Sequence, residues 1–298
     1  PRDMVSRAIA TEISAGNGAG PDSDYVYLDL THLGAETIKK KLPDITDFVR
    51  TYVKIEPIEE PIPVQPTAHY AMGGIPTDVH SRVLSDEKGT VLPGVYAAGE
   101  AACVSVHGAN RLGTNSLLDI VVFGKRAGQS MVDYVTQTKP NTINDSASDD
   151  LSKKIQNLID KEHTDEFSVA NIRKDLQESM EENAKIFRTK ETLEKQTEIL
   201  EELRERYENV TIFDKSKVHN SELVEAIELD YLLDMSEATV ASALARNESR
   251  GAHSRQDFPE RDDQNFMKHS FAFKKDNSAN LKYKDVELGK YEPMERKY

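Results

Sequence analysis

The sequence predicts a mixed α/β region that is followed by an all-α region with a short β-containing tail. Three observations lead to this fold class. Nine of the 15 glycines lie between Gly73 and Gly128, among short apolar segments, whereas residues 129–250 contain none. Amphipathic segments with a helical repeat fill most of residues 151–246. Alternating apolar residues return after residue 266. We therefore expect the chemistry in the glycine-rich stretch and a scaffold in the glycine-free one.

Composition and charge exclude several classes of protein. The 298 residues include 52 acidic and 38 basic side chains, with a formal net charge of −14. This balance argues against nucleic acid as a main partner, because phosphate binding needs clustered Lys and Arg. The single cysteine, Cys103, excludes a disulfide framework and any multi-cysteine zinc or iron–sulfur site, and we interpret it as a small buried hydrophobe. No apolar run approaches the ~20 residues of a membrane span, so we expect a soluble chain.

The N-terminal elements follow from periodicity and breakers. Residues 3–14 have apolar side chains at helical spacing, and residues 24–31 alternate in the manner of a strand. Residues 34–53 predict one or two short helices around Pro43. The Pro-rich run 57–66 predicts an extended connector and a domain boundary. Four side chains of the helical stretch are expected to face inward: Leu42, Ile45, Phe48 and Val49.

The central elements are two strands and one long helix. Residues 75–84 and 90–98 predict strands around a turn at 85–89. Residues 115–135 predict a helix that is apolar over most of its circumference at first, so we expect it to be buried. The polar stretch 139–150 predicts a linker.

The C-terminal half predicts an antiparallel bundle of amphipathic helices. Thr189 is expected to cap the third of them, with acidic residues in its first turn. A small hairpin is expected within residues 266–298. The four helices are expected at 151–161, 168–187, 190–208 and 221–246.

The first candidate for chemistry is Glu100, at the end of the segment Pro93-Gly94-Val95-Tyr96-Ala97-Ala98-Gly99-Glu100. A short apolar strand that runs into Gly-acid places a carboxylate at the C-terminal edge of a strand, where α/β folds bind ligands. Such a carboxylate accepts hydrogen bonds from ribose or ribityl hydroxyls. The alternative is a strand that ends in a turn with an exposed Glu.

The second candidate is Arg111, in the loop His107-Gly108-Ala109-Asn110-Arg111-Leu112-Gly113-Thr114-Asn115 before the predicted helix. The free backbone N–H groups of Ser116 and Leu117 would face an electron-rich group with the helix dipole behind them. The guanidinium offers a bidentate fork for a carboxylate or phosphate. The alternative is a helix cap with a surface ion pair.

Two weaker candidates complete the set. His69 precedes the pair Gly73-Gly74 by a few residues, and its alternative is a hydrogen-bonded structural histidine. The acidic residues between Asp257 and Asp263 have the chemistry of metal ligands, but the interleaved arginine favours an ion-pair network. We therefore predict no metal site.

Three segments, in this order and spacing, resemble signatures of the succinate dehydrogenase/fumarate reductase flavoprotein family. They are HYAMGGIPTD (69–78), GVYAAGEAACVSVHGANRLGTNSLLDIVVFGKRAG (94–128) and ESRGAHSRQDFPERDDQNFMKH (248–269). The resemblance runs nearly the full length and is closest to the bacterial succinate dehydrogenase branch. The related L-aspartate oxidases share HGANRL and NSLL, whereas the FPERDD segment and its hairpin favour the dehydrogenase/reductase branch.

The resemblance implies roles for three residues at a substrate site. Arg2, in RDMVSRA, matches the catalytic arginine that moves the substrate proton. His69 and Arg111 match the residues that hold the dicarboxylate and polarise its carboxylates. The implied reaction is oxidation of succinate to fumarate with hydride transfer to FAD, and fumarate reduction is the alternative direction.

The resemblance also implies how the cofactor FAD is held. Glu100 matches the ligand of the ribityl chain, and the backbone N–H groups of Ser116 and Leu117 match donors to the flavin ring. Family members also carry an N-terminal segment with a Gly-rich dinucleotide loop and a histidine that links covalently to FAD. Neither lies in residues 1–298, which begin at Pro1 without Met. We therefore expect a C-terminal piece that binds neither FAD nor succinate in isolation.

The implied organisation combines a partial capping domain, the last portion of a Rossmann-like FAD-binding domain, a bundle and a tail. The implied partners are an iron–sulfur subunit, membrane-anchor subunits and a quinone, which would place the chain peripherally on the cytoplasmic face of a bacterial inner membrane. In the alternative, the chain docks the iron–sulfur subunit as an inactive scaffold. The expected segments are a capping segment at residues 1–66, an FAD-binding segment at 67–138, a linker at 139–150, the helical bundle at 151–247 and the C-terminal domain at 248–298.

Overall fold

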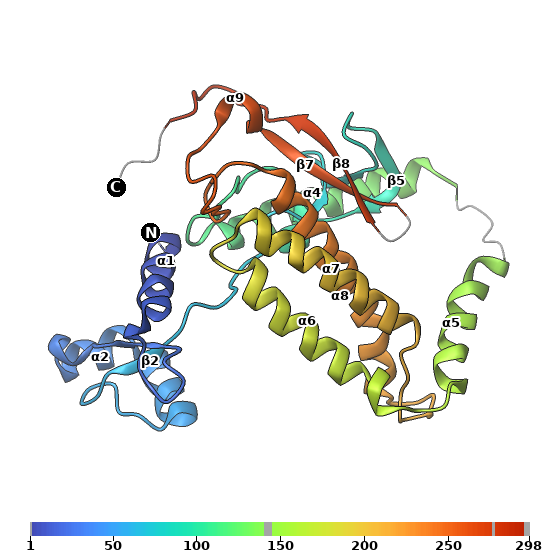
Figure 1. The fold of residues 1–298 in the computed structure, drawn as a ribbon. Coiled ribbons are helices and arrows are strands. Elements are labelled where there is room, and N and C mark those ends of the chain that lie inside the picture. The colour runs from blue at the N-terminus through green and yellow to red at the C-terminus, as the bar shows by residue number, and fades with distance from the viewer. Residues whose placement is uncertain (1, 140–144, 276–277, 295–298) are drawn as a thin grey trace. The chain divides into compact units, whose positions relative to one another are not determined.

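The computed structural model describes residues 2–139, 145–275 and 278–294, and Figure 1 shows their fold. The chain divides into two compact units, Pro1–His69 and Tyr70–Tyr298. Within the described ranges, no helix has both the length and the apolar character that a membrane crossing requires.

The first unit is a small α/β arrangement with one two-stranded sheet. Its strands β1 and β2 pair antiparallel, with Val26 opposite Val64. This pairing confirms the predicted first strand, and it shows that a portion of the Pro-rich run is a strand rather than a free connector. The predicted first helix and the helix pair around Pro43 are also confirmed. The elements in chain order are α1 (Arg2–Glu12), a π-helical turn (Ile13–Asn17), β1 (Val26–Leu28), α2 (Ala35–Lys41), α3 (Pro43–Phe48) and β2 (Ile62–Val64).

The interior of this unit differs from the predicted one. Val49 is buried as expected, but Ile45 and Phe48 are exposed. The interior position is taken by Ile38 of α2, which is fully buried. Phe48 turns outward and packs against Tyr52, with ring centroids 4.7 Å apart. The helical repeat located the helices correctly, but it did not determine which helix supplies the core.

The second unit begins with short strands. Strands β4 (Arg82–Leu84) and β5 (Val91–Tyr96) form an antiparallel hairpin, which confirms the predicted turn at 85–89. Asp86 Oδ1 holds this turn by accepting the backbone N–H groups of Lys88 and Thr90, each at 3.0 Å. Strand β3 (Ile75–Pro76) pairs in parallel with β6 (Ala102–Cys103). The predicted strand at 75–84 is therefore wrong as one element, because a turn at 78–81 divides it into β3 and β4. Cys103 is half-buried in β6, and this burial raises the pKa of its thiol.

Helix α4 spans Asn115–Gln137, as predicted, but it is not a buried helix. Asp119 and Ala127 are its buried residues, and most of its apolar side chains face outward because no described element covers that face. The apolar pattern is that of a core helix, but among the described residues this face of α4 stays exposed. The exposed apolar residues include Leu117, Leu118, Ile120, Val121, Val122, Val132 and Val135.

The predicted polar linker at 139–150 is only partly described, because residues 140–144 lie outside the described residues. Residues Asp145–Ser148 form a 3-10 helix, and helix α5 begins at Asp149. The second half of the predicted linker is therefore helical, with acidic residues in the first turn of α5 where the helix dipole favours them.

Four helices follow, as predicted, and α6, α7 and α8 pack side by side (Figure 1). Each of these three has a polar N-cap: Ser168 accepts from Asn171, Asn220 accepts from Leu223, and Thr189 forms the predicted cap through a capping box with Thr192. The bounds are α5 (Asp149–Asp160), α6 (Val169–Ala184), α7 (Lys190–Glu208) and α8 (Ser221–Ala245). Their shared core includes Leu158, Ile172, Leu176, Leu193, Leu200, Leu203, Leu229 and Leu233.

The tail forms the predicted hairpin. The short helix α9 (Asp263–Phe266) precedes β7 (Lys268–Lys275), which pairs antiparallel with β8 (Ser278–Asp285) along its whole length. Strand β7 lies beside α8, to which Lys274 is tied by an ion pair with Asp234. The hairpin therefore packs against the helical bundle at α8.

Candidate functional site

The loop before α4 delivers Arg111 to a position above an aromatic ring. The guanidinium carbon lies 4.3 Å from the centroid of the Tyr70 ring, within cation–π range. One terminal nitrogen, Nη1, donates to the Leu112 carbonyl at 3.1 Å. The Nε atom is buried and has no hydrogen-bond partner within the described residues of the chain. A buried donor without a partner is costly, which makes this Nε atom a candidate ligand contact.

Behind Arg111 lies a hydrogen-bonded set that sequence reasoning did not identify. His107 Nε2 donates to the Asp119 carboxylate at 2.9 Å and lies 3.4 Å from the Tyr70 hydroxyl oxygen. The His107 and Tyr70 rings meet edge to face, with centroids 5.6 Å apart. Burial raises the pKa of the Tyr70 hydroxyl, and the negative charge of Asp119 adds to this effect. Both effects favour the neutral form of the Tyr70 hydroxyl.

A signal for this set was present in the sequence. Asp119 is an acidic residue within the otherwise apolar stretch 117–123 of α4, and its side chain is only 3% exposed. A buried carboxylate needs a hydrogen-bonding partner, and His107 is the histidine closest to it in the sequence. The Tyr70 contact had no comparable signal, because Tyr70 is distant in sequence and joins the site through the fold.

The N-terminus of α4 supplies backbone donors. Thr114, which precedes the helix, has a positive φ of 73°, and its side chain does not cap the helix. Ser116 is half-buried in the first turn. Leu117 N–H donates to the Thr114 carbonyl at 3.0 Å, so this predicted donor is already engaged within the turn. A ligand at Leu117 would have to share or replace that bond.

Glu100 joins two of the predicted motifs. Strand β5 ends at Tyr96, and Gly99, with φ 76°, begins a 3-10 turn that contains Glu100. Glu100 is exposed, as its alternative interpretation proposed, but its Oε1 accepts the Ala71 backbone N–H at 2.9 Å. This bond places the carboxylate beside the segment that follows His69.

The other two predicted residues belong to the first unit. Arg2 is the first residue of α1, and its side chain is exposed. His69 is exposed and is the last residue of that unit, directly before Tyr70 in the chain. The structure thus brings Arg111, Glu100 and the start of α4 together in one unit, and it places Arg2 and His69 in the other.

Two of the acidic residues between Asp257 and Asp263 form the predicted ion pairs with arginine. Arg255 is fully buried and binds Asp257 with two hydrogen bonds of 2.8 and 2.7 Å, which lower the pKa of that carboxyl to about 2. Arg261 and Arg250 both bind Asp263, each at 2.7 Å. These carboxylates are therefore occupied by arginine.

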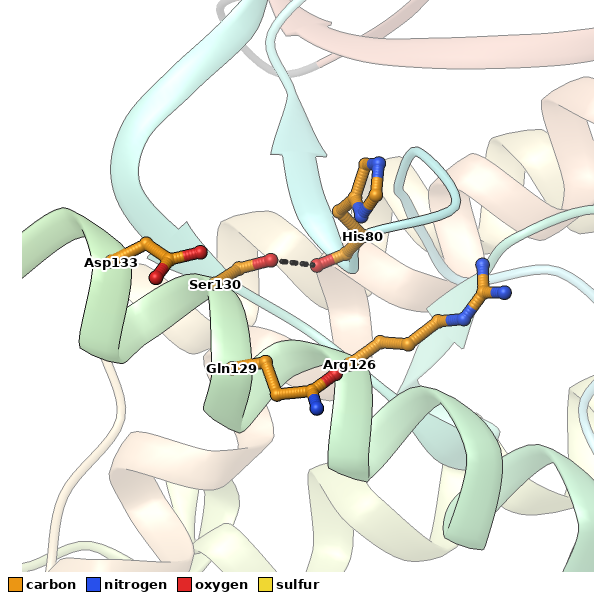
Figure 2. A pocket seen from close by; sticks show the side chains of 5 residues that line it. All are labelled: His80, Arg126, Gln129, Ser130 and Asp133. Carbon is orange, nitrogen blue, oxygen red and sulfur yellow. Dashed lines mark hydrogen bonds between the residues drawn. The ribbon is translucent and has the colours of Figure 1, made fainter.

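A separate hollow of about 380 Å³ lies along the second half of α4 (Figure 2). Two of its polar side chains tie α4 to the turn between β3 and β4. Ser130 Oγ donates to the His80 carbonyl, and Arg126 donates to the Val79 carbonyl. The hollow contains none of the predicted site residues. Its lining is His80, Arg126, Gln129, Ser130 and Asp133.

Comparison with known families accounts for most of the chain. Residues 1–117 match the family described as FAD binding domain, and residues 173–298 match the family described as fumarate reductase flavoprotein C-term. The two matches together include the Arg111 loop, the first turn of α4 and the C-terminal ion-pair network.

Individual relatives carry both names of the family. The succinate dehydrogenase flavoprotein subunit of Rickettsia bellii is 45% identical over 276 residues, which are 91% of this chain and 46% of that protein. The fumarate reductase flavoprotein subunit of a Serratia species is 43% identical over 304 aligned positions, which cover 100% of this chain and 49% of that protein. A solved structure of Escherichia coli quinol fumarate reductase superposes with a TM-score of 0.88 at 39% identity and covers 99% of this chain and 50% of that one.

The chain thus spans about half the length of the curated relatives it matches. The matched families and the flavoprotein relatives identify FAD as the family's cofactor. The chain belongs to the succinate dehydrogenase/fumarate reductase flavoprotein subunit family.

Proposed function

We propose that this chain belongs to an FAD-dependent flavoprotein subunit that oxidises succinate to fumarate. The observation that carries the proposal is the half-buried guanidinium of Arg111, held on the Tyr70 ring with an unbonded buried Nε. A planar guanidinium with free donors suits a carboxylate, which accepts two parallel hydrogen bonds. Family membership makes a four-carbon dicarboxylate the natural ligand.

Three residues would act on the substrate. Arg111 would bind one carboxylate and His69 the other, as the family resemblance implies. Arg2 would exchange the proton on the adjacent carbon. Because a guanidinium gives up its proton reluctantly and is protonated in proteins, Arg2 would serve more readily as a proton donor toward fumarate than as a base toward succinate. In the oxidative direction it would need a desolvated, charge-compensated surrounding.

The described residues fit a flavin ligand in two respects. His107 Nδ1 is a buried polar atom without a partner in the described structure. The first turn of α4 lacks a side-chain cap, which leaves its dipole available to a negatively charged group. When bound, FAD supplies the hydride acceptor for the reaction. Glu100 would hold its ribityl hydroxyls, and the backbone N–H groups of Ser116 and Leu117 would face its ring.

Two further observations support a flavin domain completed by more polypeptide. The relatives are about twice as long as this chain. Helix α4 also exposes an apolar face of the kind that is covered in a folded domain. We therefore expect residues 1–298 alone to bind neither FAD nor succinate, and a stoichiometric yellow chromophore on that piece would contradict this expectation.

Electrons would pass from the flavin to an iron–sulfur partner subunit and then to quinone. The complex would be held by membrane-anchor subunits on the cytoplasmic face of a bacterial inner membrane. Fumarate reduction is the alternative direction, because relatives of both names are similarly close. A third possibility is that the piece only docks the iron–sulfur subunit. Co-purification of a cysteine-rich partner with residues 151–247 alone would favour it.

The test uses the whole protein that contains residues 1–298, purified with FAD. Succinate should reduce an artificial electron acceptor, and fumarate should oxidise the reduced enzyme. Butyrate, which has the same carbon count and one carboxylate, serves as the matched control for succinate and should not reduce the acceptor. Turnover of butyrate equal to that of succinate would overturn a dicarboxylate site.

A further inference from the structure

The C-terminal segment, residues 248–269, contacts the loop that carries Arg111. The Ala252 backbone N–H donates to the Ala109 carbonyl at 2.9 Å. Ser105 Oγ and His269 Nε2 are hydrogen-bonded at 2.9 Å. Ala109 lies two residues before Arg111, and Ser105 lies at the start of the same loop. A segment far away in sequence therefore holds this loop at two points.

The first contact requires a glycine. Gly251 has a φ of +59°, and a Cβ added there would lie 2.5 Å from the Ala109 carbonyl oxygen and 2.6 Å from its carbonyl carbon. Side chains essentially never approach backbone this closely, so any larger residue must displace either the turn or the loop. The lack of a side chain at Gly251 is what permits the Ala252 hydrogen bond.

The turn around Gly251 is itself anchored. Arg250 N–H donates to the His253 carbonyl at 2.8 Å, and His253 N–H returns a bond to the Arg250 carbonyl at 3.0 Å. Glu248, whose side chain is fully buried, accepts from Arg246 at 2.6 Å and from Arg250 at 2.9 Å. Because the turn is braced by buried charge pairs, a clash at Gly251 is expected to move the Ala109 loop rather than the turn.

We propose that the C-terminal segment is a positioning element for Arg111, acting through Gly251–Ala252 on Ala109 and through His269 on Ser105. It holds the loop so that the guanidinium stays above the Tyr70 ring. The inference rests on the proposed function, because Arg111 is the residue assigned to the substrate carboxylate. Gly251 is assigned no contact with substrate or cofactor, so it is a positioning residue.

The test compares Gly251→Ala with Gly289→Ala in the FAD-loaded protein. The two glycines have nearly the same φ, +59° and +62°, but a Cβ at Gly289 meets no atom within 4 Å. Gly251→Ala should weaken binding of malonate, a dicarboxylate inhibitor probe, on the order of tenfold to a hundredfold, since a ~1 Å displacement can cost that much. Gly289→Ala should leave malonate binding within about twofold, and flavin content should be equal in both.

Hydrogen exchange of the backbone amides of residues 105–113 gives a second readout that needs no substrate. Exchange should be faster in Gly251→Ala than in Gly289→Ala. Equal exchange and equal malonate affinity in the two variants would overturn the proposal. If wild-type protein fails to bind malonate, the proposed function is refuted, whereas the exchange comparison still decides whether the loop is held.

A second variant covers failure of Gly251→Ala to fold. Ser105→Ala removes the hydrogen bond to His269 from an exposed position without adding bulk. Like Gly251→Ala, it should weaken malonate binding and accelerate amide hydrogen exchange in residues 105–113. Unchanged values in Ser105→Ala, together with misfolding of Gly251→Ala, would count against the proposal.

Discussion

The Arg111 guanidinium and the Tyr70 ring form the central contact of the candidate site, with 4.3 Å between the guanidinium carbon and the ring centroid. Tyr70 is in turn fixed edge to face by His107, which is bound to the buried Asp119. The chain of contacts runs from a buried carboxylate to an arginine with an unbonded donor, so each member sets the position of the next.

The ring of Tyr70 should contribute to substrate affinity through Arg111. Tyr70→Leu removes a cation–π contact worth ~0.5–2 kcal/mol and should weaken malonate binding by roughly 2- to 30-fold. Tyr70→Phe keeps the ring and should stay close to wild type. Titration of the two FAD-loaded variants with malonate measures both affinities. If Tyr70→Phe and Tyr70→Leu lose affinity equally, the ring is not the reason for the effect.

The carboxylate of Asp119 should contribute to stability. Asp119→Ala leaves His107 without its buried acceptor and should lower the free energy of unfolding by ~1.5–3 kcal/mol. Asp133→Ala, an exposed position on the same helix, is the control and should change it by less than about 0.5 kcal/mol. Urea denaturation followed by circular dichroism compares them. Equal effects would show that the buried pair contributes nothing specific.

The capping box of α7 should be visible in stability as well. Thr189→Ala removes the side chain that accepts the Thr192 N–H and should cost ~0.5–2 kcal/mol. Thr136→Ala, at an exposed position near the end of α4, removes a threonine that caps no N-terminus and serves as the control. Thermal unfolding should show a lower midpoint for Thr189→Ala alone, and a lower midpoint for both would argue against a specific cap.

His253 should make stability depend on pH. Burial and the nearby positive charges of Arg188, Arg246 and Arg255 lower its pKa from 6.5 to about 4. The unfolded chain therefore binds a proton more readily than the folded one between these values, so the unfolding free energy should fall as pH drops from about 6.5 to about 4.

Replacing His253 with glutamine removes this titration. His253→Gln retains a donor for the Arg246 carbonyl, which His253 Nε2 approaches at 3.2 Å. The slope of stability against pH in this range should become shallower than in the exposed control His80→Gln. Identical slopes in the two variants would show that His253 does not cause the loss of stability at low pH.

Local signals predicted the helices well. Repeats of apolar residues, Pro43 at a helix start and the Thr189 cap located helices within a few residues of their observed ends. Packing was harder to predict. The sequence pattern of α4 predicted burial, but burial depends on a covering element, and none of the described elements supplies it.

The same distinction applies to the site. Arg111 and Glu100 were identifiable because glycine turns and a helix start surround them in sequence. Tyr70 and Gly251 were not, because their roles come from contacts with Arg111 and Ala109 that only the fold creates. Local sequence indicates the type of chemistry, whereas the residues that hold it in place are set by tertiary contacts.

The central claim is that Arg111 binds a dicarboxylate, and malonate affinity of Arg111→Gln in the FAD-loaded protein tests it most directly. Arg126→Gln is the matched control, since Arg126 is an exposed arginine on α4 that donates to the Val79 carbonyl. Loss of charge-assisted hydrogen bonds should weaken malonate binding at least about tenfold in Arg111→Gln, with flavin content unchanged. Arg126→Gln should bind as wild type. Wild-type affinity in Arg111→Gln would contradict the account.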